Sequence, residues 1–203
     1  YVCGHICKAL NIAEYVPINI DRNITSWSDK WGPFYNGDFQ PGSNVIQEVL
    51  KSHDVVAVIH CAANSLVSLS VSTPAIYYKN NVIATIALLD KLVQLEIKTF
   101  VYSSSAAVYG DPGLNLCKES DYTKPINPYG ASKLMVEQIL RDYHKAYGIS
   151  SIGLRYFNAA GADPELEIGE DRNNETHIIP LAIEASRKLK TFNFTVEMAE
   201  QFY

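Results

Sequence analysis

Long apolar runs and an excess of basic residues are both missing from this chain of 203 residues. No apolar stretch is long enough to span a bilayer, and no cationic start leads into an apolar segment with a small-residue cleavage site. The 17 Lys and Arg residues are outnumbered by 22 Asp and Glu residues, which gives a net charge of -5. Because phosphate backbones select basic surfaces, the sequence predicts neither a nucleic acid nor a membrane as partner.

Cysteine is also scarce, at four residues: Cys3, Cys7, Cys61 and Cys117. Their spacing fits no zinc motif, because Cys3 and Cys7 lack a second pair. We therefore predict no metal site and expect four reduced thiols in a cytoplasmic protein.

What is present is an ordinary globular composition, with 47% hydrophobic and 19% charged residues. The length allows one domain with a sizeable core. The chain opens on Tyr1 in a helix-like segment and closes on Tyr203 without a domain-ending signal, so we expect a fragment of a longer protein.

Short β-rich apolar runs alternate with segments of helical periodicity. Strands are predicted at 16–20, 55–60, 99–103 and 151–155, and helices at 5–15, 44–53, 73–96, 128–147 and 178–189. The segment 27–41, rich in aromatics, Gly and Pro, is predicted to be a loop. Strands that are apolar on both faces and separated by helices predict an α/β fold with a doubly wound parallel sheet. Such sheets bind ligands at the carboxyl ends of their strands.

Three serines, Ser103, Ser104 and Ser105, stand at the carboxyl end of the predicted strand 99–103. A substrate would lie at this position in a parallel sheet. Taken alone, the serines could equally be turn and cap residues.

Tyr129 and Lys133 open the predicted helix 128–147 and are four residues apart, so they share one helix face. A Lys ammonium beside a phenol favours the phenolate and lowers its pKa, which would let Tyr129 exchange a proton near neutrality. The alternative is a Tyr and a Lys that face solvent. Since Ser105 precedes Tyr129 by 24 residues within an α/β pattern, the catalytic interpretation is favoured.

Three segments together resemble the extended short-chain dehydrogenase/reductase family, and within it the nucleotide-sugar epimerases. They are Ser-Ser-Ser-Ala-Ala-Val-Tyr-Gly at 103–110, Pro-Tyr-Gly-Ala-Ser-Lys at 128–133 and Leu-Arg-Tyr-Phe-Asn-Ala-Ala-Gly-Ala at 154–162. The resemblance runs from residue 1 to 190, which implies an incomplete NAD-binding Rossmann-like domain followed by a divergent tail at 191–203.

The resemblance implies an NAD-dependent reaction that oxidises and re-reduces a UDP-sugar at C4, interconverting UDP-glucose and UDP-galactose. Tyr129 would remove the proton of the 4-hydroxyl, and Ser105 would hydrogen-bond the 4-oxygen. Lys133 would hold the nicotinamide ribose and lower the pKa of Tyr129. Phe157 and Asn158 would lie near the nicotinamide and the UDP-sugar, respectively.

The resemblance also implies a set of further cofactor contacts. They are Asp21 on the adenosine ribose, the adenine-contacting pair Asp38 and Phe39, the small residues Cys61, Ala62 and Ala63 after a strand, the helix residue Asn80, and Ser103. A carboxylate at Asp21 would repel the extra phosphate of NADP and favour NAD. His177 would contact the UDP moiety. Asp21 could instead be an ordinary strand-end residue, Asn80 a solvated one and His177 a structural one.

The residues after Ser105 bear on the type of reaction. Sugar-nucleotide dehydratases of this family carry an Asp-Glu pair where this chain has Ala106 and Ala107, so dehydration is not expected. Epimerisation of another UDP-sugar stays an alternative.

Two expected parts of the family pattern are missing. Cys3 and Gly4 occupy the end of the glycine-rich phosphate loop, and the first strand before it is lacking. The C-terminal domain that grips the uridine nucleotide is lacking too, so a catalytically inactive nucleotide-binding fragment is a further alternative. The resemblance implies a homodimer built on the helices 73–96 and 128–147.

Overall fold

The computed structural model describes residues 1–113, 116–170, 175 and 177–188. The α-helices are α1 (Val2–Ile12), α2 (Val45–Ser52), α3 (Val67–Ser72), α4 (Pro74–Tyr77), α5 (Ala84–Gln94), α6 (Pro128–Tyr147) and α7 (Ile178–Arg187). A π-helical segment, η1 (Tyr78–Ile83), joins α4 to α5, and a 3₁₀ turn, η2 (Ala106–Val108), follows the fourth strand. The strands are β1 (Asn19–Asp21), β2 (Phe34–Asn36), β3 (Val58–His60), β4 (Thr99–Ser105) and β5 (Ser150–Tyr156).

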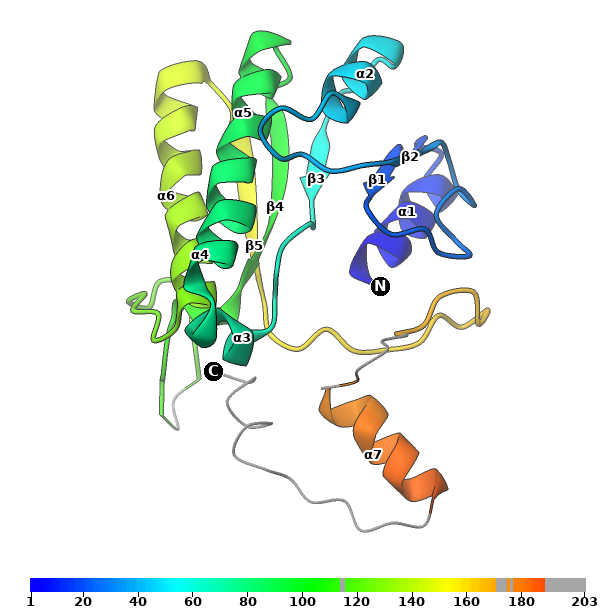
Figure 1. Ribbon diagram of the computed structural model, residues 1–203, viewed down its shortest axis with the longest axis vertical. Coiled ribbons are helices and arrows are strands. Elements are labelled where there is room, and N and C mark those ends of the chain that lie inside the picture. Colours follow the sequence, from blue (N-terminus) through cyan, green and yellow to red (C-terminus); the bar gives the residue numbers. More distant parts are fainter. Residues whose placement is uncertain (114–115, 171–174, 176, 189–203) are drawn as a thin grey trace.

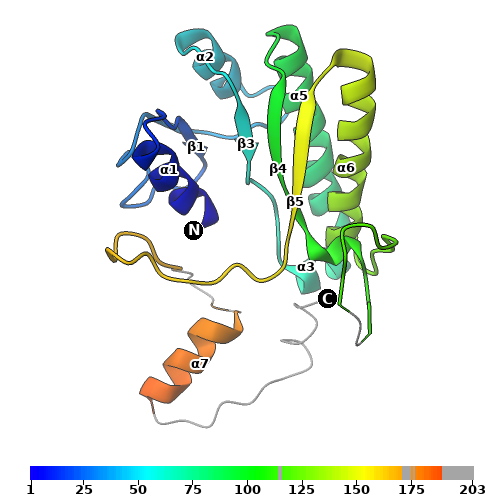
Figure 2. The same ribbon diagram turned by 180° about the vertical axis from the view of Figure 1, so that it is seen from behind.

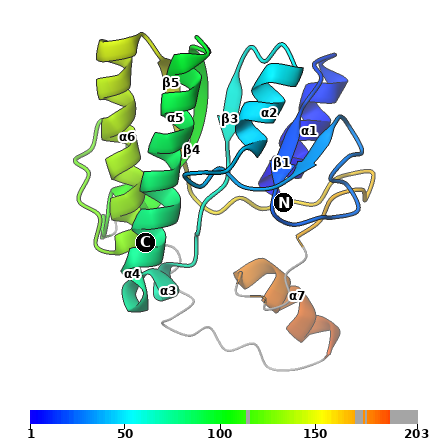
Figure 3. The ribbon, with the colours of Figure 1, turned by 45° about the horizontal axis from the view of Figure 1, so that its top comes forward.

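All described strand pairs are parallel, which confirms the predicted class of fold. β1 pairs with β2, and β4 lies between β3 and β5 in a second sheet. The register sets Phe100 opposite both Val58 and Ser151. Figure 3 shows β1 and β3 in neighbouring halves of the molecule. The described strands thus form two separate parallel sheets, one of β1 and β2 and one of β3, β4 and β5. β1 is not paired with β3.

The core lies between the three-stranded sheet and two long helices. Figures 1 and 2 show α5 and α6 on one face of β3, β4 and β5, with β5 at the front when the molecule is seen from behind. The side chains that fill this layer are buried: Leu88, Leu89, Leu92, Phe100, Tyr102, Val136, Leu140 and Ile149. On the opposite face, Ile152 and Leu154 of β5 are exposed, so this layer covers one side of the sheet only.

Helix α6 matches its predicted bounds because both ends carry strong signals. The Asn127 side chain accepts a hydrogen bond from the Gly130 N–H at 2.8 Å, Pro128 is the first helical residue, and Gly148 ends the helix in the left-handed conformation with φ 72°. This helix carries Tyr129 and Lys133.

Other elements differ from the sequence-based predictions. The strand predicted at 16–20 begins only at Asn19, two residues after Pro17, which has no N–H to offer a neighbouring strand. The segment 27–41, predicted to be a loop, contains β2. The helix predicted at 73–96 is divided into α4, η1 and α5, and α3 was not predicted.

The end of the chain is only partly covered by the structure. Helix α7 begins at Ile178 as predicted and ends at Arg187, while Leu189 and the predicted tail 191–203 lie outside the described residues. Among the described helices, none combines the length and the apolar character that a bilayer span requires.

Candidate active site

A cavity of about 1300 Å³ runs between the two sheets and reaches the carboxyl ends of β1, β3, β4 and β5. It brings together all of the residues predicted from the sequence for the site: Asp21, Asp38, Phe39, Cys61, Ala62, Ala63, Asn80, Ser103, Ser105, Tyr129, Lys133, Phe157, Asn158 and His177. Its apolar lining includes Ile6 of α1, Ile20 of β1 and Val58 of β3, so it extends between the two sheets. The position agrees with the rule that doubly wound sheets bind ligands at strand ends.

Ser105 is the last residue of β4. Its hydroxyl oxygen accepts the N–H of Ala107 at 3.2 Å and so caps η2. Its side chain also lies near enough to the Tyr129 phenol to lower the pKa of that group. This serine therefore acts as a cap residue and also lines the cavity, so the two interpretations of the sequence do not exclude each other.

Tyr129 reaches Ser105 because the start of α6 lies close to η2. A Cβ on Gly130 would come within 2.4 Å of the Ala107 carbonyl oxygen, so glycine is needed for this approach. Burial raises the pKa of the Tyr129 phenol, and the nearby Ser105 side chain opposes the rise. Tyr129 is therefore protonated at neutral pH in this arrangement.

Lys133 is 3% exposed and lines the cavity together with Tyr129. Its Nζ donates to the Ser103 backbone carbonyl at 2.7 Å and lies 4.9 Å from the centre of the Tyr102 ring and 5.8 Å from that of Tyr129. Burial lowers the pKa of Lys133 to about 8. Burial dominates the pKa of Tyr129 in this arrangement, and the lowering of that pKa by Lys133 stays a prediction.

Small and polar side chains from β3, β4 and η1 form the inner wall. The Ser103 hydroxyl donates to the Cys61 sulfur at 3.4 Å, and Ala62 and Ala63 follow directly along the chain. Asn80 is buried in η1, where its side-chain oxygen accepts from the Gln40 amide at 2.9 Å. Backbone at these positions is open to close approach by a ligand.

The three residues predicted near the adenosine lie on β1 and on the loop after β2. Asp21 ends β1, and its carboxylate accepts the Asn23 N–H at 2.9 Å. The Asp38 carboxylate accepts the Gln40 N–H at 3.2 Å, and the Phe39 ring meets the His60 ring edge-on at 4.8 Å. Both carboxylates thus shape their own turns and also line the cavity.

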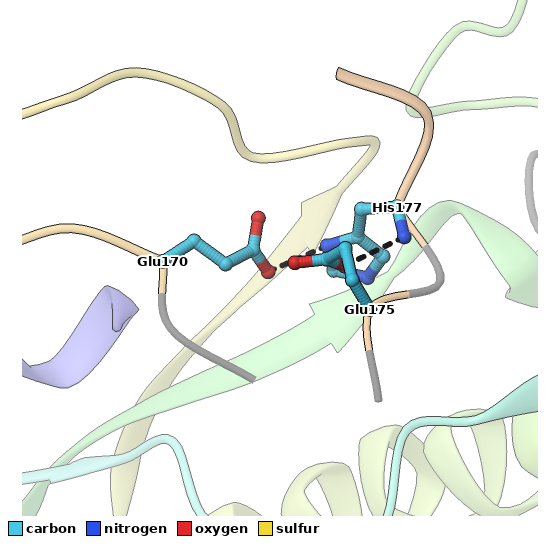
Figure 4. Close-up of side chains that lie close together, drawn as sticks. All are labelled: Glu170, Glu175 and His177. Carbon is cyan, nitrogen blue, oxygen red and sulfur yellow. Dashed lines mark hydrogen bonds and ion pairs between the residues drawn. The ribbon is translucent and has the colours of Figure 1, made fainter. Parts of the chain in front are cut away.

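The loop after β5 closes the cavity on the other side. Phe157 is 62% exposed, and Asn158 follows it. His177 is the N-cap residue of α7, and Figure 4 shows its side chain close to Glu170 and Glu175. The His177 Nδ1 lies 2.6 Å from a Glu170 oxygen, and its backbone N–H donates to Glu175 at 2.8 Å. His177 is therefore held by carboxylates at the cavity.

Sequence analysis missed Asn81, which is 2% exposed in η1. Its side chain accepts the Asn64 N–H at 2.8 Å and donates to the Asn64 carbonyl and to the Ser132 hydroxyl, both at 3.0 Å. The Ser132 hydroxyl in turn donates to the Tyr129 carbonyl at 2.7 Å. Asn81 thus ties the loop after β3 to the start of α6. The available signal was a second Asn within an apolar helical pattern, beside Asn80.

A tyrosine, a serine and a buried lysine gathered at the strand ends of a parallel α/β sheet are typical of Rossmann-like oxidoreductases and epimerases. The chain belongs to the NAD dependent epimerase/dehydratase family, whose profile matches residues 1–198.

Within that family, the chain is similar to UDP-glucose 4-epimerases. It is 46% identical over 153 residues to the one from Halalkalibacterium halodurans, covering 75% of this chain and 46% of that protein. It is 43% identical to the one from Rhizobium meliloti, covering 92% and 57%. The crystal structure of UDP-glucose 4-epimerase from Brucella ovis in complex with NAD matches with a TM-score of 0.86 and 39% identity, covering 93% of this chain and 58% of that one. The chain spans about half the length of these relatives.

Proposed function

We propose that this chain is the cofactor-binding and catalytic part of a UDP-glucose 4-epimerase, which interconverts UDP-glucose and UDP-galactose. The observation that carries the proposal is the convergence of Ser105, Tyr129 and the buried Lys133 on one cavity. Ala106 and Ala107 follow Ser105 and offer no acid that could expel a hydroxyl as water. This favours epimerisation over dehydration.

The residues around the cavity fit NAD. The backbone beside Ala62 and Ala63 is open, and the Asp21 carboxylate at the end of β1 suits ribose hydroxyls while repelling the extra phosphate of NADP. Phe157 lines the same cavity as Tyr129. When bound, NAD supplies the acceptor for the hydride that leaves C4.

The chain's own side chains would manage the proton and the sugar. Ser105 would hold the 4-oxygen, and Tyr129 would take the proton of the 4-hydroxyl and later return it. At neutral pH Lys133 keeps most of its charge, since its pKa is about 8, and this charge favours the phenolate that the transfer requires. Asn158 and His177 would contact the UDP-sugar.

The test is substitution of Tyr129 by Phe in the full-length protein. Loss of general acid–base catalysis is expected to lower kcat for UDP-galactose by about 10²- to 10⁴-fold, measured by the formation of UDP-glucose. Tyr147→Phe removes a hydroxyl from the same helix at a half-exposed position and is the matched control. Normal turnover by Tyr129→Phe would contradict the proposal.

The same assay separates the two alternatives. Turnover of an N-acetylated or uronic acid UDP-sugar in preference to UDP-galactose would identify an epimerase with another substrate. Absence of turnover with every UDP-sugar by the 203-residue chain, if that chain still binds NAD, would identify a catalytically inactive nucleotide-binding fragment.

We also propose that the full-length protein is a cytoplasmic homodimer. A contact with a second copy is supported by exposed apolar side chains along α4, η1 and α6. Among them are Ile76, Ile83 and Met135. These positions fall within the two helices predicted to form the dimer.

A further inference from the structure

The site described above is underlain by a buried ion pair that none of the proposed catalytic steps uses. Glu137 is 8% exposed and lies on α6, one turn beyond Lys133 and two turns beyond Tyr129. Arg155 lies on β5. The Arg155 Nη2 is 2.8 Å from Glu137 Oε2, and its Nε donates to Oε1 at 3.0 Å. The ion pair is therefore bidentate, which fixes the orientation of the two side chains as well as their distance.

The pair also holds two further elements. The Ser104 hydroxyl, at the end of β4, donates to Glu137 Oε1 at 2.5 Å. The remaining guanidinium nitrogen of Arg155 donates to the Tyr109 hydroxyl at 2.9 Å and to the Glu119 carbonyl at 3.2 Å. The guanidinium carbon lies 4.9 Å from the centre of the Tyr109 ring. One ion pair therefore joins β4, β5, α6 and the residues that follow η2.

These are the elements that carry the reacting groups. Ser104 is the neighbour of Ser105, and Glu137 is on the same rigid helix as Tyr129. Ser105 ends β4 and Tyr129 lies in the first turn of α6, so their separation depends on how the junction of β4 and α6 is fixed.

We propose that Glu137 and Arg155 are positioning residues, which set the separation of Ser105 and Tyr129 by locking the end of β4 to α6. The inference rests on the proposed function for its catalytic consequence. Its structural content, the locking of β4 to α6, stands apart from the identity of the substrate.

The test is Glu137→Gln in the full-length protein, which keeps the shape of the side chain and removes its charge. We expect kcat to fall about 10- to 100-fold with KM within about twofold, because a displacement of reacting groups by about 1 Å has effects of this size. If Ser105 moves away from Tyr129, its lowering effect on the pKa of the phenol is lost, and burial raises that pKa further. The pH profile of kcat should therefore move to higher pH, and raising the pH should recover part of the lost rate.

A second readout does not depend on turnover. Amide hydrogen exchange at residues 103–109 should become about tenfold faster in Glu137→Gln, because local opening of the strand end becomes easier. Ser104→Ala removes one bond to Glu137 without leaving a buried charge unpaired, and it should give a smaller change of the same kind. Asp142→Asn removes a carboxylate from the exposed face of α6 and is the control, which should change neither readout.

The outcomes are distinct. An unchanged pH profile, with a loss of kcat that matches the unfolded fraction, would show a purely structural ion pair and overturn the proposal. Unchanged kcat and exchange in both Glu137→Gln and Ser104→Ala would overturn it as well. If the unaltered protein turns over no UDP-sugar, the proposed function fails, while the exchange rates still decide whether the pair locks β4 to α6.

Discussion

His60 is a neutral imidazole enclosed at the end of β3, 5% exposed. Its Nε2 lies 3.0 Å from the Thr85 hydroxyl, and its ring stacks on Tyr102 at 6.1 Å. Burial, and secondarily the charge of Lys133, lowers the pKa of His60 to about 3. A histidine of this kind stabilises the fold only while it stays unprotonated.

The resulting pH dependence has a definite sign. Between about pH 6.5 and pH 3 the unfolded chain binds a proton at His60 that the folded chain does not, so the free energy of unfolding falls as the pH is lowered. For a pKa of about 3 the loss between pH 7 and pH 5 is about 2 kcal/mol. Urea denaturation at the two pH values measures it.

Two control variants separate the contribution of His60 from that of other titrating groups. His60→Leu should have a smaller difference between pH 7 and pH 5 than the unaltered protein, whereas His144→Gln, at an exposed position of α6, should keep the full difference. Equal differences in all three proteins would show that His60 titrates normally.

At the scale of elements, the contact between η2 and the start of α6 decides whether Tyr129 can meet Ser105. Gly130→Ala places a Cβ 2.4 Å from the Ala107 carbonyl oxygen, which is backbone and must move. We expect the free energy of unfolding to fall by about 1 to 3 kcal/mol, as in other overpacked sites. Denaturation by urea or heat measures the loss.

Another glycine provides the comparison. Gly153→Ala adds a Cβ on β5 that would lie 3.8 Å from the Glu137 side chain, an ordinary contact, and its effect should stay within about 1 kcal/mol. Equal stability of the Gly130 and Gly153 variants would contradict the close approach of α6 to η2.

The elements differ in how far the sequence predicts them. Helix α6 is predictable because Asn127, Pro128 and Gly148 are local signals for its two ends. Strand β2 is not, because Phe34–Asn36 is only three residues long and is fixed by pairing with β1. The π-helical turn η1 is also invisible to periodicity, since it changes the winding without interrupting the apolar pattern.

The site shows the same division. Residues at strand ends are predictable from the order of strands and helices, and the cavity gathers all of them. The pKa of Tyr129 is not predictable from its spacing to Lys133, because it depends on burial and on where the ammonium points. The pairing of Glu137 with Arg155 requires the register of β4 and β5.

At the scale of the whole molecule, the helices that cover the three-stranded sheet carry exposed apolar side chains on their outer surface. Ile76 of α4, Ile83 of η1 and Met135 of α6 are 52%, 51% and 45% exposed, and the three segments contact one another. Exposed apolar side chains that gather on packed helices are typical of a protein interface. We therefore expect this surface to be covered by a second copy in the full-length protein, in line with the proposed homodimer.

Sedimentation equilibrium tests this expectation. The unaltered full-length protein should have twice the mass of one chain, and a variant with Ile83→Glu and Met135→Glu should have the mass of one chain, because desolvating two carboxylates in an apolar contact is costly. Ile152→Glu introduces the same charge at a 61% exposed position of β5, on the other side of the sheet, and should remain dimeric. A single-chain mass for the unaltered protein would contradict the dimer. A dimer that survives the double substitution and dissociates on Ile152→Glu would instead place the interface on the uncovered face of β5.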